Sequence, residues 1–585
     1  MYETTVDKPV STWLMFLLAM LVGVFGGLGS IVFSIFIGLV HNLFFYGRIS
    51  IDYDYQAHMA PSPWGWAIIL VPVAGSLLVN LITSRVSPEA RGHGVPEVMN
   101  AIHYKEGRIR SVVVVAKAIA SALSIGTGGS VGREGPIIQI GSAFGSVLGQ
   151  WITMPARQRV VLVAAGAAAG IAGTFNAPLG GLAFAIELML ISISARAVAL
   201  CAVASVIATY IARFYSGLHP SFDVPALEVF GDHLTAISVL LLCLPLGLLM
   251  GVSATVFLKS IYWFEDRFAS LVKNTYQRHV LGMALVGVLL YAMQQFTGEY
   301  YVGGVGYATV LDILRHSLSN PGFLFLLFLA KLLATGLTLG SGASGGIFSP
   351  SLFLGASLGA AFGQFVNWMV PAIGIDPSVF AIAGMAAMVS GTTGALVTAI
   401  LMIFEQTRDY SAVLPIIITA SLAHVVREHF TSESIYTLKL ARRGLWLPKG
   451  MQANTAASRQ ASTIMSRDFQ VVEKSELANW LTNHRPGQGA RHTIFADQGS
   501  VYGVAGEELR YLLRDQDAEQ VAHTNVFFVT GDTRLPVLLR GMRAKNTQYA
   551  VVMRERRTDA IDDVIGVISS REIFSAIQDG VELME

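Results

Sequence analysis

Glu134 is the residue whose type and position point most directly to chemistry. It lies in the segment Gly132–Pro136, which reads Gly-Arg-Glu-Gly-Pro, between long apolar runs. An ionisable side chain in such surroundings is expected to serve a function. Glycine permits close backbone approach and proline suits a helix's first turn, so Glu134 is predicted to stand at a helix N-terminus. Its carboxylate could occupy an anion site there and leave when protonated, acting as a gate and a proton carrier. Pairing with Arg133, or capping its own helix, is the structural alternative.

Two further segments have the same design. Gly92–Pro96 reads Gly-His-Gly-Val-Pro, and Gly345–Pro350 reads Gly-Gly-Ile-Phe-Ser-Pro. The first turn of a helix presents free N–H groups and the positive end of the helix dipole, and together these bind anions. Three such helix starts predict a place where an anion exchanges its hydration shell for protein N–H groups. One of them alone would be weak support, because glycine and proline are frequent in membrane helices.

The composition indicates that these helix starts lie inside a membrane. Of 585 residues, 53% are hydrophobic and 14% are charged, whereas about a quarter are charged in soluble domains. Trp13–Val40 has no charged residue and follows Glu3 and Asp7 rather than a basic segment, so we expect a retained spanning helix and not a cleaved signal. Apolar runs continue to about Val425, and many are shorter than the roughly 20 residues that cross a bilayer. Such runs predict helices that end within the membrane, against protein or a wet cavity.

An internal repeat organises the apolar part of the chain. Pro136–Gln150 aligns with Pro350–Gln364 at an offset of 214 residues, with the proline, three glycines and the glutamine in common. A second block aligns at an offset of 218, where Glu187 falls on Glu405. Two repeated halves with broken helices are typical of transporters and pores, whose sites lie near the membrane midplane where the halves meet. Composition alone leaves open whether the halves are inverted.

In this order, the motifs resemble the CLC family of chloride channels and chloride/proton antiporters. The resemblance covers about residues 10–445 and adds Phe175–Leu179, Phe404–Thr407 and Tyr436 to the three helix starts. It implies an all-α membrane domain of two inverted repeats with broken helices, and a homodimer with one anion pore in each subunit. Glu134 matches the family's gating glutamate, and chloride is the expected substrate. The implied anion-binding residues belong to the helix starts and the final membrane segment: His93, Gly94, Gly132, Arg133, Gly135, Ile347, Phe348 and Tyr436.

Two positions depart from the family's pattern, and a third has a second interpretation. His93 stands where the family has a serine donor. Either its imidazole donates an N–H to the anion, or the ring turns away and a backbone amide serves instead. Leu188 follows Glu187, where antiporters often carry a proton-shuttling glutamate. Leucine relays no protons, which favours a channel, or an antiporter whose protons reach Glu134 by water or another group. Glu187 itself is predicted to be structural, and Tyr436 without the resemblance would be an interfacial anchor.

After about Thr431 the long apolar runs end and the chain becomes richer in polar and charged residues. We expect an N-terminal tail over residues 1–11, a membrane domain over 12–445 and a polar linker over 446–462. A soluble α/β module follows, which resembles a degenerate CBS domain over 463–518 and a second over 519–585. Its predicted strands are Gln470–Val472, Thr493–Phe495, Val501–Val504, Val526–Val529, Tyr549–Met553 and Val564–Ile568, with helical stretches at Glu508–Leu513, Leu535–Met542 and Arg571–Ile577.

The tail has one candidate nucleotide contact. Ser569 lies where a CBS domain often contacts a ribose or phosphate, and Glu572 replaces the usual aspartate. The first copy has Gly503–Gly506, without a hydroxyl, at the equivalent point. Adenine nucleotide binding is therefore the lesser alternative to a structural, dimerising role.

Several classes of function are disfavoured. A net charge of +1 implies no nucleic-acid partner. Cys201 and Cys243 lie in apolar runs without metal or disulfide spacing, so no metal and no cofactor is expected.

The prediction is chloride transport in exchange for protons, with a passive gated channel as the alternative because of Leu188. A membrane enzyme using Glu134 and His93, or a CBS-based sensor, are more distant hypotheses. The expected location is a bacterial inner (plasma) membrane, with several spanning helices and a cytoplasmic tail.

Overall fold

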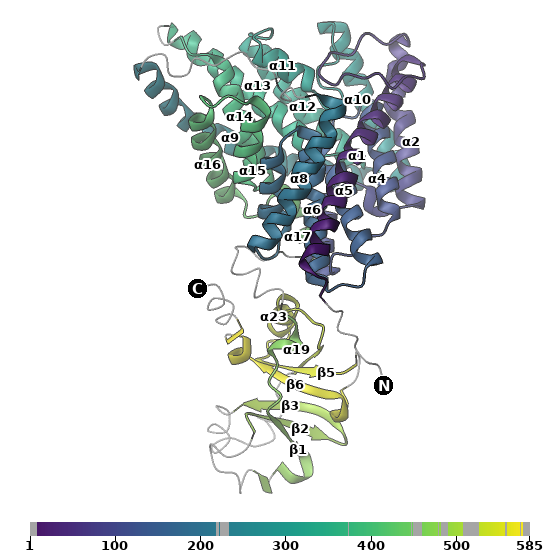
Figure 1. The fold of residues 1–585 in the computed structure, drawn as a ribbon, viewed down its shortest axis with the longest axis vertical. Helices are drawn as coiled ribbons and strands as arrows, with labels where there is room; N and C mark the ends of the chain where they lie inside the picture. The colour runs from purple at the N-terminus through teal and green to yellow at the C-terminus, as the bar shows by residue number, and fades with distance from the viewer. Residues whose placement is uncertain are drawn as a thin grey trace. The chain divides into compact units, whose positions relative to one another are not determined.

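The computed structural model shows two compact units, Met1–Trp446 and Leu447–Glu585, which are described separately below (Figure 1). The residues described are 9–217, 222, 233–371, 374–445, 447, 459–477, 479–480, 490–506, 526–555, 559–573 and 575–576. The predicted helical stretch Glu508–Leu513 and most of the predicted linker therefore lie outside the described residues.

The first unit is a layered bundle of helices. Its first half contains α1 (Thr12–Tyr46), η1 (Gly65–Ile69), α2 (Leu70–Arg85), η2 (Pro88–Ala90), α3 (Val95–Tyr104), α4 (Val112–Gly126), α5 (Glu134–Trp151), α6 (Ala156–Phe175), α7 (Pro178–Phe184), the π-helical turn η3 (Ala185–Met189) and α8 (Ala195–Ser216). The second half contains α9 (His233–Leu271), α10 (Thr275–Thr297), α11 (Tyr307–Leu314), α12 (Pro321–Ser341), α13 (Phe348–Met369), α14 (Pro377–Thr393), α15 (Leu396–Thr407), α16 (Val413–Phe430) and α17 (Ile435–Arg442).

Helix lengths fit a membrane protein with broken helices. Among the described residues, eight helical stretches are long and apolar enough to span a bilayer. The predicted spanning helix Trp13–Val40 is confirmed within α1, which is 35 residues long. The shorter apolar helices include α4, α14 and α15, of 10–17 residues each. These helices match the predicted short runs.

The internal repeat is visible in the packing, where α5 lies on α6 and α13 on α14. A methyl group added to Gly141 would come within 2.2 Å of the Gly166 carbonyl oxygen. In the second half, a methyl group on Gly355 would come within 2.3 Å of the Gly384 carbonyl oxygen. Equivalent glycines thus make the same backbone contact in both halves, and only glycine leaves room for it.

Two carboxylates tie the halves together reciprocally. Glu187 of the first half accepts the first free N–H groups of α15, from Val397 at 2.8 Å and Thr398 at 2.7 Å. Glu405 of the second half accepts two N–H groups at the start of α7, at 3.0 and 2.7 Å. A carboxylate at a helix N-terminus satisfies free donors and the helix dipole. The contacts of Glu187 are those of the structural residue that the sequence predicts.

The second unit contains two three-stranded sheets of the same design. One has the order β1 (Phe469–Glu473), β2 (His492–Asp497) and β3 (Ser500–Gly506); the other has β4 (Phe527–Thr530), β5 (Tyr549–Met553) and β6 (Val564–Ser569). In each, the first pair of strands is parallel and the second pair antiparallel. All six predicted strands are confirmed, and α23 (Leu535–Ala544) contains the predicted helix Leu535–Met542.

Packing in this unit begins before the predicted boundary at 463. Ala461, in the short helix α19 (Ala461–Ile464), is fully buried and contributes to a core with Leu538 and Ile568. Apolar side chains of both sheets, such as Ile494 and Val551, share a second core. Residues 570–573 and 575–576 are helical, within the stretch predicted at Arg571–Ile577.

Candidate anion site

Backbone hydrogen bonds join the three glycine-rich segments. The N–H of Gly132 donates to the Gly346 carbonyl at 2.8 Å, and the N–H of Gly346 donates back at 2.6 Å. The N–H of Gly92 donates to the Ala343 carbonyl at 3.0 Å, and the N–H of Gly345 donates to the Gly92 carbonyl at 3.3 Å. The N-termini of α3, α5 and α13 therefore meet, although the sequence separates them by up to about 250 residues.

Close backbone contact explains the glycines of these segments. A methyl group on Gly135 would lie 2.2 Å from the His93 carbonyl oxygen and 3.0 Å from the Cα of Gly346. Gly94 precedes α3 with a φ of 83°, in the left-handed region that favours glycine. The three helix starts can approach one another only because these positions carry no side chain.

The Glu134 carboxylate is fully buried and reaches the start of α13. Its Oε1 accepts hydrogen bonds from the Tyr307 hydroxyl, at 2.6 Å, and from the Ser349 hydroxyl. Its Oε2 lies 3.4 Å from the backbone N–H of Ser349, in the first turn of α13. A methyl group on Gly132 would lie 2.1 Å from that same Oε2. A carboxylate oxygen thus takes the donors that a free anion would use at this helix end.

Two of the predicted anion-binding residues belong to the same turn. Ile347 is the residue that precedes α13, and Phe348 is its first helical residue; both are buried. The Phe348 ring lies 5.3 Å from the Phe175 ring, in the segment Phe175–Leu179 that the sequence singles out. Their backbone thus lies in the same helix start as Ser349, which donates to Glu134.

His93 and Tyr436 lie together. Both side chains are buried, and their ring centroids are 5.9 Å apart. The Nδ1 of His93 has no hydrogen-bond partner among the described residues. Two lysine side chains lie against the same segment: a methyl group on Gly92 would lie 2.5 Å from Lys439 Nζ, and one on Gly94 would lie 3.3 Å from Lys117 Cε. The role of His93 as an anion ligand stays a prediction.

The guanidinium of Arg133 forms its hydrogen bonds with residues other than Glu134. It donates to the Thr174 carbonyl at 3.0 Å and to the Ser34 hydroxyl at 3.3 Å. It also lies 4.0 Å from the centroid of the Tyr55 ring, a cation–π contact. The donors to Glu134 are the two hydroxyl groups and the Ser349 N–H described above.

Tyr307 and Ser349 are the functional candidates that the sequence analysis missed. Tyr307 is the first residue of α11 and follows Gly306, whose φ is 85°. Gly304–Tyr307 reads Gly-Val-Gly-Tyr, the counterpart 212 residues later of Gly92–Val95, Gly-His-Gly-Val. Extending the repeat to this segment would have identified a fourth glycine-rich helix start.

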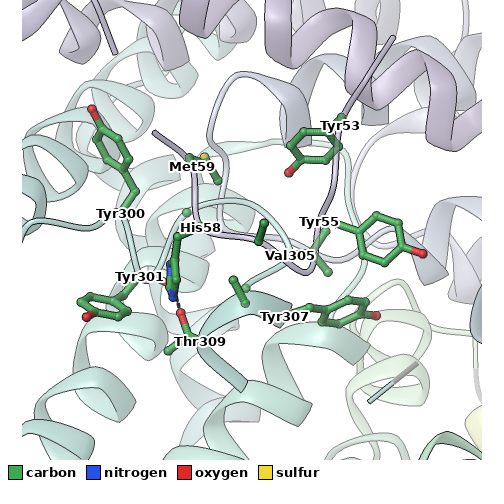
Figure 2. Close-up of a pocket in the computed structure, with 13 residues that line it drawn as sticks. Tyr53, Tyr55, His58, Met59, Tyr300, Tyr301, Val305, Tyr307 and Thr309 are labelled. Carbon is green, nitrogen blue, oxygen red and sulfur yellow. Dashed lines mark hydrogen bonds between the residues drawn. The ribbon is translucent and has the colours of Figure 1, made fainter. Parts of the chain in front are cut away.

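Tyr307 also lines a small pocket (Figure 2). The pocket wall comes from the segment after α1, with Tyr53, Tyr55 and His58, and from the segment before α11, with Tyr300 and Tyr301. The rings of His58 and Tyr301 are in contact, with centroids 5.2 Å apart. His58 Nε2 lies 2.6 Å from a carboxylate oxygen of Asp312. Tyr307 therefore lines this pocket and also donates its hydroxyl hydrogen to the buried Glu134.

The candidate nucleotide residues in the second unit contact each other. The N–H of Ser569 donates to Glu572 at 2.8 Å, and the Ser569 hydroxyl donates to the same oxygen. The other carboxylate oxygen lies 3.3 Å from Nε2 of His492. Burial raises the pKa of Glu572, but the hydrogen bonds from His492 and Ser569 outweigh it and lower that pKa to about 2. The carboxylate is therefore charged at neutral pH. A nucleotide phosphate that contacts Ser569 would have to approach this negative charge.

Comparison with known proteins assigns the family. The family model described as voltage gated chloride channel matches residues 75–428. The chain belongs to the CLC family. Its helices form the CLC fold of two inverted repeats, and it is a multi-pass membrane protein in a family of transporters rather than enzymes.

Individual CLC proteins show how far the similarity extends. The H(+)/Cl(−) exchange transporter ClcA of Vibrio campbellii is 35% identical over 396 residues, which are 65% of this chain and 80% of the relative. The crystal structure of a slow cyanobacterial Cl−/H+ antiporter has a TM-score of 0.64 and 28% identity, covering 74% of this chain and 99% of that one. A eukaryotic CLC transporter, 20% identical with a TM-score of 0.62, shares the fold over 96% of this chain and 98% of its own.

Proposed function

We propose that this CLC protein exchanges chloride for protons across its membrane and that Glu134 is its gate. The observation that carries the proposal is the Glu134 carboxylate on the donors at the start of α13. A carboxylate that takes an anion's place blocks the path while charged and leaves it when protonated, so proton uptake and anion entry into the vacated site are linked at one residue. Relatives named as H(+)/Cl(−) exchangers support the same mode.

Passive conduction is the second candidate. Leu188 lies in the π-helical turn η3, beside a glutamate already used to cap α15. Leucine provides no proton relay on that side of the gate. Exchange then requires that protons reach Glu134 through water or another group, whereas a channel requires only that the gate open.

Reconstituted liposomes distinguish the two modes. With a chloride gradient imposed across the vesicle membrane, an exchanger drives protons against their own gradient. We expect uphill proton movement, and a chain that never shows it under any chloride gradient is a channel. Glu134→Gln should abolish proton movement or gating and keep chloride flux. Glu106→Gln, which changes a carboxylate that pairs with Arg108 and Arg159, is the matched control and should behave as the unaltered protein.

For the second unit, we propose a structural, dimerising CBS pair rather than a nucleotide sensor. The mutual bonds of Ser569 and Glu572 support this, because a nucleotide would have to displace them. Titration of the full chain with ATP and AMP by calorimetry should give no binding heat. Saturable binding that Ser569→Ala removes would reverse the proposal.

A further inference from the structure

Three oxygen atoms form a closed cluster at the gate. The Tyr307 hydroxyl is 2.6 Å from Glu134 Oε1 and 3.0 Å from the Ser349 hydroxyl, which itself donates to Glu134 Oε1. All three side chains are buried. Within this cluster the carboxylate supplies no hydrogen atom, and each hydroxyl supplies one.

The hydrogen count decides what happens when the carboxylate leaves. While Glu134 is charged, both hydroxyl hydrogens point to its Oε1. Once it has swung away, Tyr307 and Ser349 can bond each other with only one of their two hydrogens. The other hydrogen is left without an acceptor in a buried site, which is costly. An anion that enters the vacated place provides that acceptor.

The Tyr307 hydroxyl is held in place independently of Glu134. Lys331 is fully buried and donates to the carbonyl oxygens of Val302 and Gly304, both at 3.1 Å, which fixes the segment leading into α11. The Tyr307 ring packs between those of Tyr55, at 5.9 Å, and Phe222, at 5.3 Å. A donor fixed in this way need not reorganise when its acceptor changes.

We propose that the Tyr307 hydroxyl donates in turn to the Glu134 carboxylate and to the transported anion. Tyr307 is thus both a latch that holds the gate closed and a ligand of the anion that replaces the gate. The inference deepens the proposed function and rests on Glu134 being the gate. The donor set is complete only when α11 of the second half is added to the starts of α5 and α13.

The test separates the two roles with Tyr307→Phe, which removes one oxygen and keeps the ring. Chloride binding to purified protein is measured by calorimetry in the Glu134→Ala background, where no carboxylate competes. We expect the chloride dissociation constant to rise about tenfold when Tyr307→Phe is added, the effect of one lost hydrogen bond to an anion. In the protein with Glu134 intact, Tyr307→Phe should increase chloride efflux from liposomes severalfold, because the latch has lost a donor.

Tyr53→Phe is the matched control, since it removes a tyrosine hydroxyl from the wall of the same pocket and should leave both measurements unchanged. An unchanged dissociation constant in Glu134→Ala/Tyr307→Phe overturns the anion-ligand role, and an unchanged efflux in Tyr307→Phe overturns the latch. If Glu134→Ala alone left proton coupling and gating as they were, the proposed function itself would have failed.

A second variant covers the case in which Tyr307→Phe does not fold. Incorporating 3-fluorotyrosine at position 307 keeps the ring and makes its hydroxyl a stronger donor. Chloride binding in the Glu134→Ala background should then tighten, and efflux with Glu134 present should slow. Changes in the opposite direction, or none, would overturn the proposal.

Discussion

The segments that lead into α3 and α11 share a glycine at positive φ and a buried lysine, and they differ in the other side chains. Gly94 and Gly306 precede the two helices with φ of 83° and 85°. Lys117 donates to the Ala90 and Gly92 carbonyls at 3.0 and 2.7 Å, as Lys331, 214 residues later, does in its own half. The difference teaches that the repeat supplies a symmetric scaffold on which the donors are placed asymmetrically.

The asymmetry lies in two side chains. The first segment carries His93 followed by Gly94 and Val95, and the second carries Val305 followed by Gly306 and Tyr307. His93 lies beside Tyr436, whereas Tyr307 donates to Glu134. Equivalent helix starts therefore place different side chains at the candidate anion site.

The largest expected effect comes from removing either scaffold lysine. Lys331→Met leaves the buried Val302 and Gly304 carbonyl oxygens without their lysine donor, which should cost about 2–4 kcal/mol of stability. Lys117→Met should cost about 1–3 kcal/mol, because the Ala90 and Gly92 carbonyls keep the Ser344 hydroxyl and the Gly345 N–H as donors. The midpoint of thermal unfolding in detergent measures it. Lys273→Met, at an exposed lysine, is the control and should not shift the midpoint. A large effect for Lys117 alone would show that only one segment depends on its lysine.

The next effect comes from the glycines of the same segments. In Gly94→Ala the new methyl group would lie 2.8 Å from Gln139 Oε1, and in Gly306→Ala it would lie 2.8 Å from the Phe353 ring. Backbone strain at positive φ and this contact together should cost about 2–3 kcal/mol. Gly298→Ala is the matched control, because its φ is 87° and nothing lies within 4 Å of the added group. Equal losses in all three variants would mean that strain alone matters.

The two sheets of the second unit allow the same comparison with a smaller effect. Ser569 N–H donates to Glu572, whereas Gly506 N–H, at the equivalent point, donates to the Tyr549 hydroxyl at 3.1 Å. Glu572→Gln should destabilise this unit by about 1–2 kcal/mol by removing a charged acceptor. Tyr549→Phe should cost about 1 kcal/mol, since its bond is neutral. Hydrogen exchange of the β6 amides in the full chain would measure both.

The pH dependence of the second unit follows from the same carboxylate. The pKa of Glu572 is lowered from 4.5 to about 2 in the folded chain, so its contribution is complete above about 4.5. This contribution is lost as the pH falls toward 2, because protonation removes the negative charge of the carboxylate to which His492 and Ser569 are hydrogen-bonded. Glu572→Gln should flatten the stability profile of the unit over that range. A profile that keeps its slope in the variant would assign the effect to other carboxylates.

The smallest expected effect concerns the reciprocal caps. Glu187→Gln and Glu405→Gln each weaken a carboxylate cap on a helix of the other half and should cost about 0.5–1 kcal/mol. The thermal midpoint again measures the loss, with Glu106→Gln as the surface control. Similar losses in both variants sharpen the picture of a symmetric scaffold, and a loss confined to one half would break it.

Local patterns predicted much of what the structure contains. α1 and the six strands follow from hydrophobicity over a few residues, because burial of each element depends on its own periodicity. The helix start at Glu134 follows from glycine and proline, which act on the backbone locally. The equivalence of Pro136 and Pro350 also identified the starts of α5 and α13 as counterparts.

The partners of Glu134 were beyond such patterns. Tyr307 and Ser349 are 173 and 215 residues away from it, and their hydroxyl groups carry no local sign of a shared acceptor. The sequence determined the types of groups at the site and the helix starts that present them, because these depend on neighbouring residues. Only the tertiary structure decided which donors meet the carboxylate, because the packing of two halves brings α5, α11 and α13 within hydrogen-bond distance of one another.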